Sequence, residues 1–103
     1  TSLVTDETPA GFLDMAACDA RGLYLLRTPR LDASFHGAGD VTAALFLAHL
    51  LRGRDTRAAL SLAGSSLAGL LRRTIEAGDG ELALIAAQDE FVAPSRLLQA
   101  ETL

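Results

Sequence analysis

The sequence predicts an α/β fold made of a β-hairpin, two helices and a strand, in that order. Three observations lead to this prediction: two short apolar runs flank a polar turn, two longer helical segments follow, and a further short apolar run comes near the end. Half of the 103 residues are hydrophobic, which is enough for the core of one small unit. No internal repeat, linker or low-complexity tract divides the chain.

The hairpin is predicted from the runs Phe12–Ala17 and Gly22–Thr28, which are separated by the turn signal "CDARG". Pro29 closes the second run. Cys18, the one cysteine, is expected to act as a small apolar residue of the hairpin. A single cysteine excludes an internal disulfide framework and a cysteine metal cluster.

The first helix is expected over Val41–Leu51, with Gly53 marking its end. This segment is apolar on nearly every face, which predicts a helix that is buried on all sides. It is too short for a membrane span of about 20 residues. The hairpin, the other helix and the strand offer too few partners to cover it. We therefore expect the 103 residues to be a piece of a longer chain, whose missing sheet covers this helix.

The second helix is predicted to begin at Asp55 or Thr56, either of which is a suitable cap, and to stop at the "AGDG" sequence of residues 77–80. Its apolar residues recur at three- and four-residue spacing, as expected for one buried face. They are Leu60, Ala63, Leu67, Leu70 and Leu71. Glu81–Ala87 is the strand candidate, and residues 88–95 are expected to form a turn or a single helical turn.

The charge distribution argues against nucleic acid as a partner. The net charge is −4, and the basic residues are scattered except for Arg72 and Arg73. That pair is best interpreted as a solvated helix end. Asp89 and Glu90 are expected to be exposed, and His49 is expected to be a core or helix-edge histidine.

The sequence "GAGD" at Gly37–Asp40, directly before the first helix, predicts an anion site. The first amides of a helix have no internal partner, and the helix dipole adds partial positive charge there. Asp40 in such a turn would repel a resting anion. Its presence makes sense if it accepts a proton from a hydroxyl that attacks a phosphate. The alternative interpretation is that Asp40 is an ordinary N-cap preceded by two turn glycines.

The turn followed by "VTAALFLAHLLRG" resembles the C-terminal signature of the ribokinase-like kinases. More narrowly, the chain resembles the C-terminal third of the pyridoxal kinase family. The supporting stretches are "TSL", "ETPAGFLDMAACD", "LDASFHGAGD", "GLLRRTIEAG", "ELALIAAQDEFVAP" and "AETL". The resemblance implies that residues 1–103 are the C-terminal nucleotide-binding and catalytic segment of a three-layer kinase fold, which is incomplete on its own.

In such kinases the γ-phosphate of ATP is transferred to the 5′-hydroxymethyl group of pyridoxal, pyridoxine or pyridoxamine. The resemblance therefore implies that Asp40 is the catalytic base and that Gly37, Ala38 and Gly39 form the anion hole. The resemblance also implies that four residues bind the nucleotide: Thr1, Ser2, Leu31 and Phe35. Small residues at 63–69, "AGSSLAG", are interpreted as close helix packing; the alternative is that they leave room for adenine.

The resemblance further implies Mg²⁺ as a cofactor, but the family's metal motif lies outside this segment, and we assign no metal ligand here. His36 departs from the small or apolar residue expected before the first glycine and is not taken as a ligand. A cytoplasmic homodimer, with no membrane or nucleic-acid partner, is expected. Two alternatives stay open: a sugar or nucleoside kinase of the same superfamily, and a non-catalytic fragment.

Overall fold

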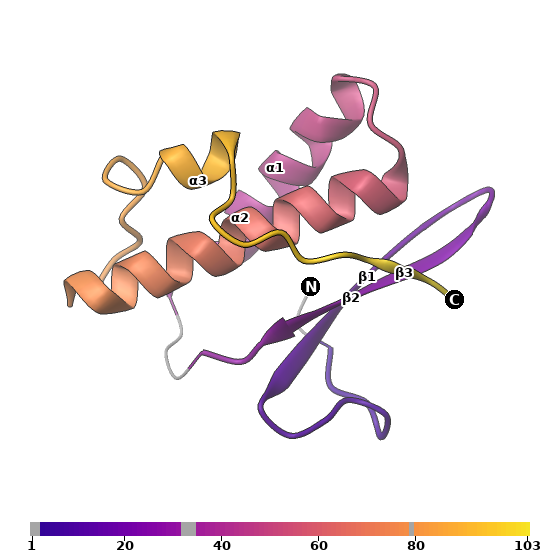
Figure 1. Cartoon of the computed structure of the whole chain (residues 1–103), viewed down its shortest axis with the longest axis horizontal. Coiled ribbons are helices and arrows are strands. Elements are labelled where there is room, and N and C mark those ends of the chain that lie inside the picture. The colour runs from indigo at the N-terminus through magenta and orange to yellow at the C-terminus, as the bar shows by residue number, and fades with distance from the viewer. Residues whose placement is uncertain (1–2, 32–34, 79) are drawn as a thin grey trace.

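The computed structural model describes residues 3–31, 35–78 and 80–103. Its first element is an antiparallel hairpin of β1 (Phe12–Asp19) and β2 (Gly22–Pro29). Phe12 lies opposite Pro29, and Asp19 lies opposite Gly22. The predicted hairpin is therefore confirmed (Figure 1). The Asp19 carboxylate stabilises the turn by accepting hydrogen bonds from the backbone amides of Arg21 and Gly22, at 2.8 and 3.1 Å.

The third strand of the sheet is β3 (Glu101–Thr102), which pairs antiparallel with β2. The prediction of a strand at Glu81–Ala87 is wrong, because these residues form an irregular segment of turns. The physical reason is that a short apolar run has no side-chain period that distinguishes a strand from a packed turn. The short helix α3 (Asp89–Val92) agrees with the single helical turn predicted nearby.

Helix α1 (Ala38–Leu51) forms where a helix was predicted but is not buried on all sides. Among its residues, all of which the structure describes, Thr42 is the one that is buried. Leu47 is 55% exposed and Leu51 78% exposed. The expectation of complete burial is wrong for this chain, because α1 packs along one side, against α2. The leucines on its other side remain in contact with solvent.

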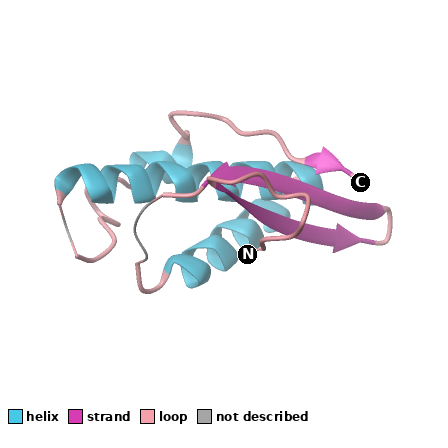
Figure 2. Ribbon diagram, turned by 90° about the horizontal axis from the view of Figure 1, so that it is seen from below, coloured by secondary structure: helices cyan, strands magenta, loops and turns pink. Residues whose placement is uncertain are grey.

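Helix α2 (Thr56–Ala77) is the centre of the fold. Asp55 caps it as predicted, since its carboxylate accepts a hydrogen bond from the amide of Ala58 at 2.7 Å. Gly78 ends it with a left-handed φ of 72°. The helix packs against α1, α3 and both long strands (Figures 1 and 2). None of the helices in the described ranges combines the length and the apolar composition that crossing a bilayer requires.

The small residues of α2 allow close contact with its neighbours. A Cβ atom added at Gly64 would lie 2.1 Å from Leu26 Cδ2, and one added at Gly69 would lie 2.2 Å from Glu90 Oε1. Residues 63–67 and 69 are buried. The structure thus supports the packing interpretation of "AGSSLAG". The space beside Gly64 is occupied by side chains of the sheet, and the space beside Gly69 is occupied by Glu90 of the segment that follows α2.

Hydroxyl groups along α2 hold this following segment in place. Ser61 Oγ accepts a hydrogen bond from the Ala100 amide, and Ser65 Oγ accepts one from the Leu98 amide, both at 2.8 Å. The other contacts of this kind pair Ser66 Oγ with the Glu90 carbonyl and Thr74 Oγ1 with the Ala83 amide. The return of the chain from the end of α2 to β3 is therefore fixed by a row of helix side chains, although it contains little regular structure.

Candidate functional site

The candidate site is the glycine turn at the start of α1. Gly37 is the N-cap residue and has a φ of 89°, in the left-handed region that glycine adopts without steric cost. Ala38, Gly39 and Asp40 are the first three helical residues, so their amides lie at the positive end of the helix dipole. The Ala38 amide contacts the Phe35 carbonyl at 3.5 Å, which is long for a hydrogen bond. This arrangement is suited to holding an anion.

Asp40 does not cap the helix. The N-cap is Gly37, and α1 has no side-chain cap hydrogen bond. Asp40 is exposed in the first turn, where a carboxylate is accessible to a ligand bound at the amides. The alternative interpretation of Asp40 as an N-cap is therefore wrong. Gly37, and not Gly39, is the glycine whose positive φ the turn requires.

The predicted nucleotide-binding residues have different outcomes. Leu31 and Phe35 are half-buried and lie in the loop that leads from β2 to the turn. Phe35 reaches the turn directly through its carbonyl contact to Ala38. Thr1 and Ser2 lie outside the described residues. The structure therefore brings Phe35 to the turn, and the nucleotide-binding roles of all four residues stay predictions.

Sequence analysis missed Leu82, whose side chain lies beside the turn. The Cδ1 atom of Leu82 is 3.9 Å from where a Cβ atom would be at Gly37, which is ordinary van der Waals contact. Leu82 is half-buried and, like Ala38 and Val41, packs against the margin of the core. It comes from the segment that was expected to be a strand. No sequence signal links positions 37 and 82, since the contact depends on how α2 returns the chain.

His36 and His49 do not join the turn as a catalytic pair. His36 is exposed. His49 is half-buried in the last turn of α1, where burial and then the charges of Arg54 and Arg52 lower the pKa of its imidazole. His49 thus agrees with the prediction of a helix-edge histidine. An α-helix rises about 1.5 Å per residue, so His49 lies about 14 Å from Asp40 along α1.

Asp89 and Glu90 differ from the expectation that both are exposed. Asp89 is exposed and pairs with Arg73. Glu90 is only 1% exposed, and both the amide and the hydroxyl of Ser95 donate hydrogen bonds to its carboxylate. Burial raises the pKa of Glu90, but these hydrogen bonds and the charge of Arg72 outweigh that effect, so its pKa is lowered. The carboxylate is therefore a buried structural anchor, and Arg73 is an ion-pair partner rather than a freely solvated helix end.

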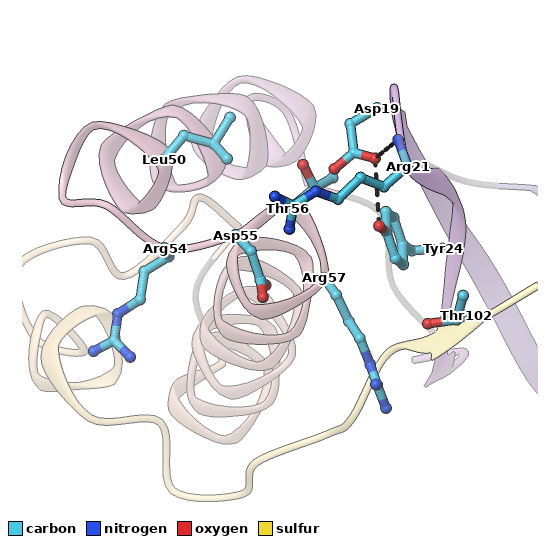
Figure 3. Close-up of a pocket in the computed structure, with 9 residues that line it drawn as sticks. All are labelled: Asp19, Arg21, Tyr24, Leu50, Arg54, Asp55, Thr56, Arg57 and Thr102. Atoms are coloured by element: carbon cyan, nitrogen blue, oxygen red, sulfur yellow. Dashed lines mark hydrogen bonds between the residues drawn. The ribbon is translucent and has the colours of Figure 1, made fainter.

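A separate polar pocket of about 470 Å³ lies where the hairpin turn meets the start of α2 (Figure 3). Its lining residues are Asp19, Arg21, Tyr24, Leu50, Arg54, Asp55, Thr56, Arg57 and Thr102. The pKa of Asp19 is lowered by the Thr56 hydroxyl first and by the Arg21 amide next. Leu50 is at the far end of α1 from Gly37, about 20 Å along the helix, so this pocket is not part of the glycine turn.

Within the ranges that the structure describes, no three histidine, cysteine, aspartate or glutamate side chains gather closely enough to hold a metal ion. These described residues therefore do not form a metal centre by themselves.

Comparison with known proteins gives a consistent result, although no family model matches the chain. The chain is 52% identical over 101 residues to the pyridoxal kinase PdxY of Granulibacter bethesdensis, a match that covers 98% of the chain and 35% of that relative. The crystal structure of Leishmania donovani pyridoxal kinase with ADP superposes with a TM-score of 0.80 at 26% identity, covering 99% of the chain and 36% of that structure. The same enzyme with ADP and pyridoxine gives a TM-score of 0.80 at 24% identity.

The fold and the glycine turn thus define the chain as part of a ribokinase-like kinase. Within that class, the chain is similar over nearly its whole length to a part of curated pyridoxal kinases. The chain spans about a third of the length of the curated relatives it matches.

Proposed function

We propose that the protein containing this chain transfers the γ-phosphate of ATP to the 5′-hydroxymethyl group of pyridoxal, or of pyridoxine or pyridoxamine. The observation that carries the proposal is the 52% identity to a curated pyridoxal kinase over nearly the whole chain. A solved relative of the same fold is described in complex with ADP and pyridoxine. These matches favour a B6 vitamer over the sugar and nucleoside acceptors of the wider superfamily.

We assign the role of general base to Asp40. The acceptor hydroxyl must lose a proton as it attacks phosphorus, and an exposed carboxylate beside the anion site is placed to accept it. The amides of Gly37, Ala38 and Gly39 then stabilise the negative charge that develops on the transferred group. The left-handed Gly37 supports this role, because it turns the chain sharply enough to present these amides together.

We assign the nucleotide contacts to Leu31 and Phe35, with Thr1 and Ser2, which lie outside the described residues, as further contacts. Half-buried apolar side chains in the loop that leads to the turn are suited to a base or ribose, since they remove apolar surface from water on binding. The proposal includes Mg²⁺, with ligands outside the described residues, because ATP is the substrate. It also includes a cytoplasmic homodimer as the working form of the complete protein.

The test is phosphorylation by the complete protein with ATP and three acceptors in parallel: pyridoxal, ribose and adenosine. We expect turnover with pyridoxal and at most trace turnover with the other two. Turnover with ribose or adenosine in preference to pyridoxal would place the protein elsewhere in the superfamily. No turnover with any acceptor would support a non-catalytic role.

A further inference from the structure

Thr74 lies near the end of α2 and is fully buried, yet no part of the reaction described above uses it. Its hydroxyl donates a hydrogen bond to the Leu70 carbonyl at 2.7 Å, within the helix. The same oxygen accepts a hydrogen bond at 3.1 Å from the amide of Ala83, nine residues further along the chain. One buried atom therefore ties the segment after α2 to the helix.

The position that this hydrogen bond fixes is next to the glycine turn. Ala83 directly follows Leu82, whose Cδ1 atom contacts the Gly37 position at 3.9 Å. Arg73 adds a second tie three residues later by donating a hydrogen bond to the Ala86 carbonyl at 2.8 Å. Figure 2 shows the start of α1 and the segment after α2 toward the same end of the molecule. The end of α2 thus holds an apolar side chain against the proposed phosphate-binding turn.

We propose that Thr74 is a positioning residue for nucleotide binding, which acts through the Ala83 amide and the Leu82 side chain. This inference rests on the proposed function. A glycine has no side chain with which to anchor its turn, and the Leu82 Cδ1 atom is the heavy atom found within 4 Å of the place where a Cβ atom at Gly37 would be, among the described residues. Loss of the Thr74 hydroxyl leaves the Ala83 amide without its partner, and the segment then moves to reach water. The turn loses its packing neighbour as a result.

The chain contains a matched control on the same helix. Ser61 Oγ donates to the Arg57 carbonyl at 2.9 Å and accepts from the Ala100 amide at 2.8 Å, which repeats the double hydrogen bond of Thr74. Ser61 is near the start of α2 and anchors the chain beside β3, away from the glycine turn. Ser61→Ala removes an equivalent anchor without touching the segment that carries Leu82.

The experiment measures the Kd and KM for ATP, the KM for pyridoxal and kcat in the complete protein. We expect Thr74→Val to raise the Kd and KM for ATP about fivefold, the size of one net hydrogen bond, with little change in kcat or in the KM for pyridoxal. Hydrogen exchange of the Ala83 amide should accelerate in the same variant. Thr74→Ser keeps the hydroxyl and should restore both readouts. Ser61→Ala should leave the ATP constants unchanged.

A second variant tests whether Thr74 acts on the turn through the Leu82 side chain. Leu82→Ala should weaken ATP binding to a similar extent, and the double variant with Thr74→Val should be no worse than Thr74→Val alone. An unchanged ATP affinity in Thr74→Val despite faster exchange at Ala83 would overturn the inference, as would an equal loss in Ser61→Ala. ATP affinity is measured without an acceptor, so failure of the wild type to phosphorylate pyridoxal refutes the proposed function separately.

Discussion

Asp14 and Arg27 face each other across the hairpin and form a two-point ion pair. Arg27 Nε donates to Asp14 Oδ1 at 2.8 Å, and Nη2 donates to Oδ2 at 3.0 Å. Asp14 is only 2% exposed, whereas Arg27 remains partly exposed. The hydrogen bond from Arg27 lowers the pKa of Asp14, and this effect outweighs the cost of its burial. The pair fixes the register of β1 against β2, because a shift by one residue would leave a buried carboxylate without its partner.

This pair predicts an acid-sensitive contribution to stability. A carboxyl whose folded-state pKa is lowered stabilises the fold above its unfolded pKa, about 3.9, and that contribution is lost as the pH falls through the lowered folded pKa. Arg27→Gln should therefore lower Tm by several degrees at pH 7 and by clearly less below pH 3. Thermal unfolding of the complete protein at both pH values measures this. Arg21→Gln, on the exposed hairpin end, is the control; an equal pH response in both variants would contradict the prediction.

Asp40→Asn should lower kcat by at least about a hundredfold, the lower range for loss of a general base. ATP affinity should change far less, because the amides of the turn remain. Steady-state kinetics and calorimetry with ATP separate the two effects. Asp55→Asn removes a carboxylate at the start of α2 while keeping a good N-cap residue, and it should keep kcat within about twofold. A near wild-type kcat in Asp40→Asn would show that Asp40 is not the base.

The two glycines of the turn should respond differently to substitution. Among the described residues outside its own helix turn, a Cβ atom added at Gly39 would meet no heavy atom within 4 Å, so Gly39→Val should fold with little change in Tm but lose activity, since valine then covers the proposed anion site. Gly37→Ala should lose about 1–2 kcal/mol of folding free energy, because its φ of 89° is left-handed. Urea unfolding and the pyridoxal assay measure both. A folded Gly39→Val protein with wild-type kinetics would refute the anion hole.

The 103 residues on their own should phosphorylate nothing. The described ranges contain the proposed base and the proposed anion site but no cluster of metal ligands. They also expose Leu47 and Leu51 on one helix, and exposed apolar patches promote association. A coupled ATP-consumption assay with pyridoxal, together with light scattering, should find an inactive and self-associated or poorly folded chain. A monodisperse, active monomer would contradict both halves of this prediction.

The parts of the fold that sequence predicts well are those set by local chemistry. The hairpin follows from two apolar runs and a turn, and α2 follows from its spacing, the Asp55 cap and Gly78. The glycine turn was also located correctly, although its assignment as a site stays a prediction. These features depend on residues close together in the chain, so a single sequence contains their signals.

The parts that sequence missed depend on contacts between distant residues. Segment 81–87 is apolar enough for a strand, but its Ala83 amide donates to the Thr74 hydroxyl of α2 instead of to a neighbouring strand. Glu90 is buried because Gly69 leaves space for its carboxylate and Ser95 supplies donors. The predicted burial of α1 was too high. Its apolar composition suggested neighbours on every side, but among the described elements α1 packs mainly against α2.

The row of hydroxyls on α2 has a consequence for how the chain tolerates mutation. Ser61, Ser65 and Thr74 bind main-chain amides, which every residue except proline possesses. The path of the return segment is thus encoded in the helix and is largely independent of the segment's own side chains. Most replacements at Ala83, Leu98 or Ala100 that fit the available space should preserve this path, whereas proline at any of the three would break an anchor. Ala100 is fully buried, so a library restricted to the half-buried Ala83 and Leu98 would retain the fold while varying the surface that the segment presents.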